Sequence, residues 1–218
     1  MLRPLSDLDV TGLENKVSCL SSCSADDGKS IVSFNLAKRL ADTDNGVLFI
    51  DADMRNSMMA KRTGISRNLK GLSHYLAGKS EASEIVYATS IRNLYLIPTG
   101  RFPKNPTELL NKEAYAKLID GMKQTFDYVI IDTPPLGAVV DAALIAKSAD
   151  ASILVISPNV VSRRAAKIVK EQLVNANPNF LGVILNKAGE GTNRYGYGKK
   201  YGYGYGYGYG NYGQDTEE

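Results

Sequence analysis

The apolar residues of this 218-residue chain fall into short uninterrupted runs, separated by longer segments with helical spacing. Runs that are apolar on both faces, rather than alternating with polar residues, are typical of buried parallel strands. We assign six such strands, at Val17–Ser21, Val47–Asp51, Leu94–Ile97, Tyr128–Asp132, Ser152–Ile156 and Gly182–Asn186.

The segments between these strands repeat apolar residues at the spacing of one helix face. The predicted helices are Lys29–Ala41, Thr107–Thr125, Ala138–Ala149 and Ser162–Ala176. Because strands that alternate with helices favour right-handed crossovers, the fold class we expect is α/β, with a doubly wound, mostly parallel sheet. The segment from Arg55 to Arg92 is polar. We expect it to be a mainly helical surface excursion rather than a second domain.

The pattern changes completely after residue 188. Eight of the 13 tyrosines lie beyond that point, most of them alternating with glycine: Tyr195, Tyr197, Tyr201, Tyr203, Tyr205, Tyr207, Tyr209 and Tyr212. A segment with so few aliphatic residues cannot bury enough surface to offset the chain entropy lost on ordering. We therefore divide the chain into a folded domain, residues 1–188, and a disordered tyrosine-rich tail, residues 189–218.

The composition of the chain limits its cellular location, its partners and the chemistry it can perform. The formal net charge of +3 is too small to indicate nucleic acid as a partner. No run of about 18 apolar residues occurs, and the first residues lack the apolar stretch of a secretory signal. Two cysteines, Cys19 and Cys23, are too few for a disulfide framework. We expect a cytoplasmic protein. His74 is the only histidine, which argues against histidine-dependent catalysis.

The first predicted strand runs into a loop that ends in Gly28, Lys29 and Ser30, directly before the first predicted helix. This is the sequence context of a phosphate-binding loop, although Cys23 stands where the full pattern has its first glycine. Backbone N–H groups and the helix dipole at such a helix start attract phosphate oxygens. Lys29 is expected to reach the β- and γ-phosphates and Ser30 to ligate Mg²⁺, so the sequence predicts a P-loop NTPase fold.

Two further predicted strands end in acidic residues. Asp51 and Asp53 close the second strand, and Asp132 closes the fourth. The carboxyl ends of parallel strands meet at the edge of the sheet where ligands bind. Since Mg²⁺ takes a few hard oxygen ligands, Ser30, Asp53 and Asp132 would form its site. Asp51 is then the candidate base that accepts the proton of an attacking hydroxyl.

The order of these motifs resembles that of the bacterial tyrosine kinases. The matching segments are Gly-Lys-Ser at 28–30, Phe-Ile-Asp-Ala-Asp-Met-Arg at 49–55, Val-Ile-Ile-Asp-Thr-Pro-Pro at 129–135, Asn-Pro-Thr-Glu-Leu-Leu at 105–110 and the tyrosine cluster. The resemblance covers nearly everything from residue 16 to the tail.

The resemblance implies ATP and Mg²⁺ as cofactors and phosphoryl transfer to tail tyrosines of a neighbouring subunit, in capsular or exopolysaccharide synthesis. It further implies a ring-like homo-oligomer, a tyrosine phosphatase, and a membrane-embedded polysaccharide co-polymerase that activates the kinase at the inner face of the membrane. The residues implied in nucleotide binding are Asp27, Gly28, Lys29, Ser30 and Ile31 of the loop, with Asn186 at the adenine.

Some positions depart from the family. Asp26 stands where the loop usually has a second glycine, Ile31 stands where threonine is usual, and residues 1–16 lack the Glu-x-x-Arg-x-x-Arg segment used in self-association. The carboxylates of Asp26 and Asp27 are expected to repel a polyphosphate unless they turn outward. Two alternatives therefore stay open. One is a partition-type regulatory ATPase, whose signature lysine is replaced here by Ser24; the other is a catalytically weak scaffold with an aromatic interaction tail.

Overall fold

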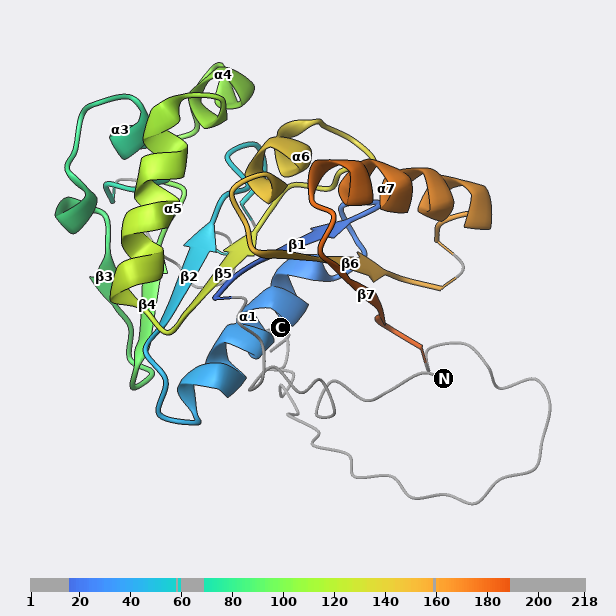
Figure 1. Ribbon diagram of the computed structural model, residues 1–218, viewed down its shortest axis with the longest axis horizontal. Helices are drawn as coiled ribbons and strands as arrows, with labels where there is room; N and C mark the ends of the chain where they lie inside the picture. Colours follow the sequence, from blue (N-terminus) through green and yellow to red (C-terminus); the bar gives the residue numbers. More distant parts are fainter. Residues whose placement is uncertain (1–15, 58, 60–68, 159, 189–218) are drawn as a thin grey trace, which may run out of the picture. The chain divides into compact units, whose positions relative to one another are not determined.

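The computed structural model describes residues 16–57, 59, 69–158 and 160–188 (Figure 1). The predicted tail and its eight tyrosines lie outside these residues, so the division at residue 188 stays a prediction. The strands are β1 (Val17–Ser22), β2 (Val47–Asp51), β3 (Tyr87–Ala88), β4 (Leu94–Ile97), β5 (Tyr128–Asp132), β6 (Ala151–Ile156) and β7 (Phe180–Leu185). The helices are α1 (Lys29–Ala41), α3 (Leu72–Leu76), α4 (Pro106–Leu110), α5 (Glu113–Thr125), α6 (Asp141–Ala146) and α7 (Arg163–Ala176).

The strands form one sheet in the order β3-β4-β2-β5-β1-β6-β7. All neighbouring pairs are parallel except β3 and β4, which are antiparallel. The expected doubly wound, mostly parallel sheet is therefore confirmed. In this order β1 lies between β5 and β6, so the segments that follow these three strands emerge side by side at the carboxyl edge of the sheet.

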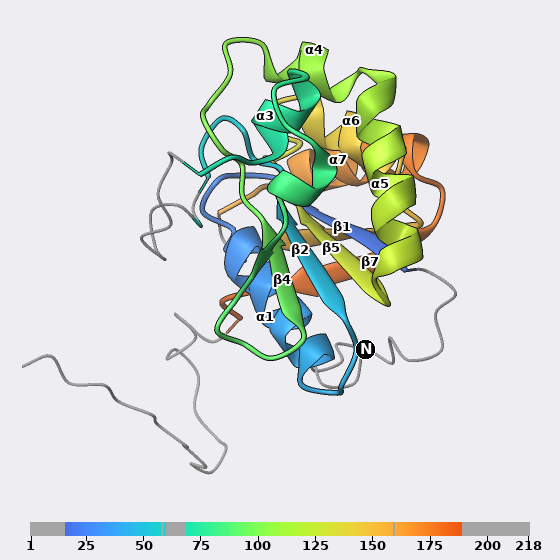
Figure 2. The same cartoon turned by 90° about the vertical axis from the view of Figure 1, so that its left-hand side faces the viewer.

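Helices cover both faces of the sheet, with α1 on one side and α5, α6 and α7 on the other (Figures 1 and 2). Successive strand residues point to opposite faces. In β2, Val47 and Phe49 join the apolar cluster that contains Leu36 of α1. Leu48 and Ile50 join the larger cluster on the other face, with the α5 to α7 side chains. This two-sided burial explains why β2 reads as a continuous apolar run.

Two predicted helices differ from those observed. The segment Thr107–Thr125 is not one helix but two, because Asn111 ends α4 and the extended backbone of Lys112 precedes α5. The predicted helix Ala138–Ala149 is reduced to Asp141–Ala146. Its first residues instead form turns, in which the carbonyl of Pro135 accepts hydrogen bonds from the backbone N–H of Ala138.

Two expectations about strands were wrong in part. The described part of the excursion Arg55–Arg92 holds α3 and a 3-10 turn at Ala82–Glu84, but also β3, a short strand that extends the sheet. The last strand is not buried on both faces, because β7 lies at the edge of the sheet. Val183 and Leu185 are 47% and 37% exposed there.

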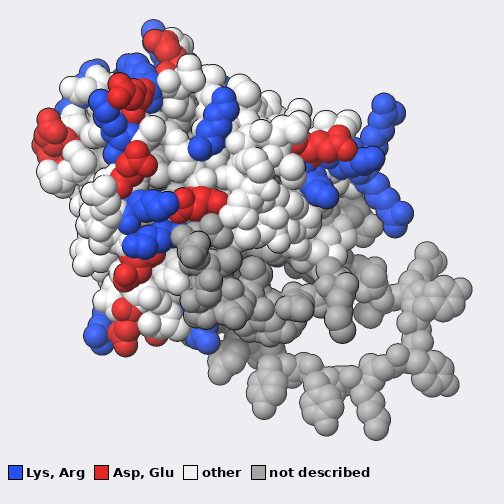
Figure 3. Space-filling model, viewed as in Figure 1, with Lys and Arg blue, Asp and Glu red and all other residues white. Residues whose placement is uncertain are grey.

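On the face drawn in Figure 3, Lys and Arg gather at the right-hand end, over α7, and are interspersed with Asp and Glu elsewhere. Within the part of the chain that the structure describes, no helix has both the length and the apolar character needed to cross a bilayer.

Candidate functional site

The phosphate loop connects β1, which is completely buried, to α1 at the carboxyl edge of the sheet. Gly28 precedes α1 with a φ of 80°, a left-handed conformation that glycine adopts without strain. A Cβ atom at Gly28 would also lie only 2.2 Å from the Asn186 side-chain nitrogen. The backbone N–H groups of Ile31 and Val32 donate to the Gly28 carbonyl, whereas those of Lys29 and Ser30 precede these bonds, so the start of α1 presents donors suited to an anion.

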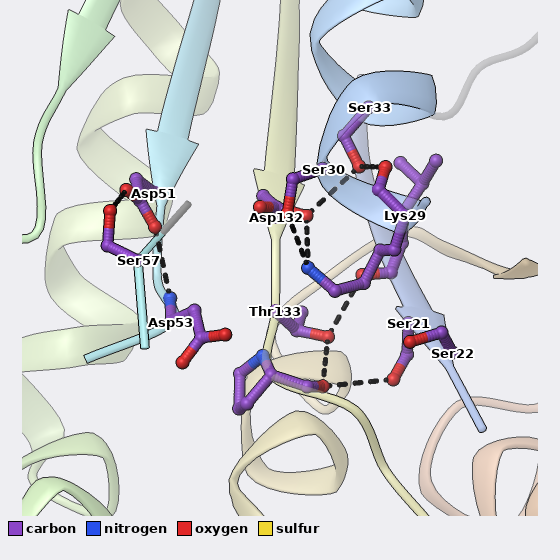
Figure 4. Close-up of polar contacts among 12 residues, drawn as sticks. Ser21, Ser22, Lys29, Ser30, Ser33, Asp51, Asp53, Ser57, Asp132 and Thr133 are labelled. Atoms are coloured by element: carbon purple, nitrogen blue, oxygen red, sulfur yellow. Dashed lines mark hydrogen bonds and ion pairs between the residues drawn. The ribbon is translucent and has the colours of Figure 1, made fainter. Parts of the chain in front are cut away.

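Lys29 and Asp132 form a buried ion pair at the centre of the site (Figure 4). The Lys29 Nζ donates to Asp132 Oδ1 at 2.5 Å and to the Ser30 hydroxyl at 3.2 Å. The hydroxyl of Ser33 also donates to Asp132 Oδ1, at 3.2 Å. The other oxygen, Oδ2, is buried and has no hydrogen-bond partner among the described residues. One carboxylate oxygen is thus fully engaged and the other is left for a ligand.

Asp51 lies directly beside Asp132, because the pairing of β2 with β5 sets the two residues opposite each other. Its carboxylate is 2% exposed and accepts a hydrogen bond from the Ser57 hydroxyl. Burial and the negative charge of Asp132 raise the pKa of Asp51 to about 7, while Ser57 and Lys29 act in the opposite direction. A carboxyl group that titrates near neutral pH is suited to exchange a proton with a substrate.

Asp53 shapes the turn that follows β2. Its Oδ1 accepts hydrogen bonds from the backbone N–H groups of Arg55, at 3.2 Å, and Asn56, at 2.9 Å. In the described part of the chain, no three His, Cys, Asp or Glu side chains are placed to hold a metal ion together. The predicted magnesium ligands include only two carboxylates, Asp53 and Asp132, which is sufficient for Mg²⁺ because it usually shares phosphate oxygens and water. The unpartnered Asp132 Oδ2 fits such an ion.

The acidic residues of the loop are not both turned outward. Asp27 is completely buried, whereas Asp26 is exposed. The Asp27 carboxylate accepts hydrogen bonds from the backbone N–H groups of Ser24, at 2.8 Å, and Ser157, at 3.0 Å. It therefore faces the protein interior rather than the open side of the loop. Ile31, also predicted to bind the nucleotide, is 42% exposed on the first turn of α1.

Asn186 lies next to the phosphate loop although it is far away in the sequence. It follows β7, and its side-chain Nδ2 donates to the backbone carbonyl of Asp27 at 2.9 Å. The Nζ of Lys187 donates to the carbonyl of Asp26 at 2.9 Å. The end of β7 therefore supports the loop directly, while the adenine contact implied for Asn186 stays a prediction.

Arg55, whose side chain is 40% exposed, pairs with the buried carboxylate of Asp141 in a polar group that the sequence analysis missed. Its Nε and Nη2 donate to the two carboxylate oxygens of Asp141, at 2.7 and 3.2 Å. The Arg55 Nη2 and the Asp141 Oδ1 also contact the hydroxyl of Thr107, at 2.9 and 2.6 Å. The hydrogen bond to Asp141 raises the pKa of Arg55 further above its usual range. These contacts tie the end of β2 to α4 and α6.

Two more side chains at the site, Ser33 and Ser57, were missed. Ser33 follows Lys29 by one helical turn, so helical spacing was a signal that could have identified it. No sequence spacing identifies Ser57 or Asp141. Their contacts with Asp51 and Arg55 form only when separate segments of the chain pack together.

We expect the Asp141→Asn substitution to lower the free energy of unfolding by about 1–3 kcal/mol, because it removes the charge that the Arg55 guanidinium meets. Asp141 is only 1% exposed, so water reaches the Arg55 guanidinium only from its own, 40% exposed side. Urea denaturation at pH 7 measures the effect. The control is Glu113→Gln, which breaks an exposed pair with Lys117 and should change the free energy by less than about 0.5 kcal/mol. Equal effects of the two substitutions would contradict the structural role of Asp141.

Known proteins share both the sequence and the fold. A sequence profile of the AAA domain matches residues 19–177. The tyrosine-protein kinase CpsD of Streptococcus agalactiae is 40% identical over 199 residues, which cover 89% of this chain and 87% of that protein. The kinase domain of the Escherichia coli tyrosine kinase ETK superimposes with a TM-score of 0.77 and 34% identity, covering 86% of this chain and 73% of that domain.

The fold also occurs in a protein with a different role. The septum site-determining protein MinD of Pyrococcus horikoshii, in complex with Mg-ADP, matches with a TM-score of 0.69 and 25% identity, over 80% of this chain and 71% of that one. The kinase relatives and this fold imply that the chain binds a nucleotide. The similarity to CpsD spans nearly the whole of both proteins, so it concerns the family as well as the fold. The chain belongs to the bacterial tyrosine kinases.

Proposed function

We propose that this protein is a tyrosine autokinase that transfers the γ-phosphoryl group of ATP to tail tyrosines of a neighbouring subunit. The observation that carries the proposal is the cluster of Lys29, Asp132 and Asp51 at the carboxyl edge of the sheet, in a tyrosine-kinase family member. The acceptors would be the eight tyrosines between residues 195 and 212. Most of them are flanked by glycine, which has no side chain to obstruct a neighbouring hydroxyl group.

ATP and Mg²⁺ fit the residues of the site. Lys29 and the first-turn N–H groups of α1 would hold the phosphates, and Ser30, Asp53 and Asp132 would surround the metal. An unpartnered buried carboxylate oxygen is costly, so the free Oδ2 of Asp132 supports a cation beside it. When bound, Mg²⁺ would neutralise the charge that develops on the β- and γ-phosphates.

Asp51 would act as the base. The tyrosine oxygen bonds to the γ-phosphorus, the bond from that phosphorus to the β,γ-bridging oxygen breaks, and ADP leaves. Asp51 takes the hydroxyl proton, and its pKa of about 7 leaves a large fraction of the carboxyl groups ionised at neutral pH. The hydroxyl of Ser57 holds the carboxylate in place through its hydrogen bond.

The wider setting is also a proposal. In keeping with the similarity to the tyrosine-protein kinase CpsD, the protein would act in capsular or exopolysaccharide synthesis. A membrane-embedded activator would bring it from the cytoplasm to the inner face of the membrane. A ring-like homo-oligomer would bring one subunit's tail to the site of the next, and a tyrosine phosphatase would reverse the modification. The small net charge supports a protein without a nucleic-acid partner.

Mass spectrometry of the tail tests the proposal. After incubation of the full chain with ATP and Mg²⁺, with and without the cytosolic segment of a candidate activator, we expect phosphotyrosine between residues 195 and 212. A variant with all eight tyrosines changed to phenylalanine is the control, and it should bind nucleotide normally. An unmodified tail despite measured nucleotide binding would indicate a regulatory ATPase. A chain that does not bind nucleotide would indicate a scaffold.

A further inference from the structure

Asp27 is a completely buried carboxylate inside a loop that is built to bind phosphates. Its two oxygens accept hydrogen bonds from the backbone N–H of Ser24, within the loop, and from that of Ser157, just after β6. Hydrogen bonds to an ionised group are stronger than neutral ones. The carboxylate therefore fastens the loop to the end of a strand that lies 130 positions away in the sequence.

The backbone carbonyl of Asp27 also links the loop to distant segments of the chain. It accepts hydrogen bonds from the Ser157 hydroxyl, at 3.3 Å, and from Nδ2 of Asn186, at 2.9 Å. Since the donor end of the Asn186 amide is engaged, its acceptor end, Oδ1, is the atom left for a ligand. An acceptor suits the exocyclic amino group of adenine, whereas guanine carries a carbonyl oxygen at the corresponding position.

We propose that Asp27 is a positioning residue that joins the phosphate loop, the end of β6 and Asn186 into one unit before the nucleotide binds. The unit fixes the loop shape that receives the phosphates and the amide orientation that selects adenine over guanine. The inference rests on the proposed function in taking ATP as the ligand, and its selectivity for adenine rests on the predicted contact of Asn186. It gives Asp27 no part in the chemical step.

The physical basis is preorganisation. If the loop already has its bound shape, nucleotide binding does not have to supply the free energy needed to order it. Without the carboxylate, the buried N–H groups of Ser24 and Ser157 lose their acceptor, and the loop is free to take other shapes. Asp26 offers a matched comparison, because it is adjacent and exposed, and its carboxylate accepts no hydrogen bond within the described segments.

The experiment compares Asp27→Asn with Asp26→Asn in the full chain. Asparagine keeps the shape of the side chain, but its NH₂ group faces one of the two N–H donors that the carboxylate accepts. By calorimetric titration with Mg²⁺ present, we expect the Asp27→Asn variant to bind ATP about 10-fold more weakly and to discriminate less between ATP and GTP. In kinase assays, KM for ATP should rise while kcat at saturating ATP stays within about twofold. Asp26→Asn should bind ATP at least as tightly as the wild type.

Wild-type ATP affinity in Asp27→Asn would overturn the proposal, as would a lower kcat with unchanged KM. Equal losses of ATP and GTP binding would overturn the coupling to Asn186. If Asp27→Asn does not fold, Ser157→Ala replaces it, because it removes only the hydroxyl link and should weaken ATP binding about threefold; unchanged affinity there would count against the proposal. These results can be told apart from a failure of the proposed kinase function. If the wild-type tail stayed unmodified, the calorimetric titrations would still show the expected difference in ATP binding between the wild type and Asp27→Asn.

Discussion

Replacing Lys29 with methionine is expected to abolish tail phosphorylation, lowering the transfer rate by at least about 10³-fold. Methionine has a similar length but no charge, so it cannot stabilise the negative charge that develops on the transferred phosphoryl group. The measurement is the single-turnover rate of phosphotyrosine formation from radiolabelled ATP. Lys38→Met is the matched control, because Lys38 is an exposed residue of the same helix, α1, and should leave the rate unchanged.

The same Lys29 substitution also tests the buried ion pair. Without Lys29, Asp132 keeps the Ser33 hydroxyl as a partner but no longer meets a positive charge. Breaking a buried pair from one side is strongly destabilising, so nucleotide-free Lys29→Met should unfold more easily than the Lys38→Met control by about 3 kcal/mol. Circular dichroism establishes that the variant is folded before its rate is measured. A folded Lys29→Met chain with the wild-type rate would refute the assigned role of Lys29.

Replacing Asp51 with asparagine is expected to lower the transfer rate by about 10²–10⁴-fold, which is the usual contribution of a general base. In the wild type, kcat/KM should rise as the pH increases through about 7, because Asp51 must lose its proton before it can accept one. The variant should lose this pH dependence. A wild-type profile that is flat between pH 6 and 8 would argue that another group accepts the proton.

We expect Asp51→Asn to stabilise the fold at alkaline pH while it removes activity. Burial and Asp132 raise the folded pKa of Asp51 from 3.8 to about 7. Between these values the folded state holds a proton that the unfolded state releases, so the stability of the wild type falls as the pH rises and remains low above 7. Asparagine is neutral throughout. The variant should gain about 1–3 kcal/mol at pH 8, and the gain should shrink towards pH 5.

Urea denaturation at pH 5 and pH 8 measures this difference. Asp120 is exposed on α5, so Asp120→Asn serves as the control and should show no comparable gain at the higher pH. A loss of stability in Asp51→Asn at pH 8 would contradict the unfavourable burial of the Asp51 charge. Lost activity together with gained stability would show that the Asp51 carboxylate serves catalysis while it lowers the free energy of unfolding.

The amino-acid sequence by itself determined the sheet, the phosphate loop and the position of the acidic residues on it. Mostly apolar runs identified β1, β2 and β5, because strands buried on both faces do not alternate between apolar and charged residues. Gly28, Lys29 and Ser30 marked the loop, because a strand, this triplet and a helix are contiguous in the chain. Asp51 and Asp132 fell at one edge, because parallel strands share the direction in which they end.

The tertiary structure alone decided which side chains meet. Nothing near Asp27 in the sequence indicates that it turns inward to Ser157, and nothing near Arg55 points to Asp141. The sequence also placed β7 in the interior, whereas its position at the edge of the sheet leaves it half-exposed. Local periodicity reports the conformation of a segment and the faces it buries. The partner of a buried charge is set by segments 86 to 130 positions away, which only the packed chain brings within hydrogen-bond distance.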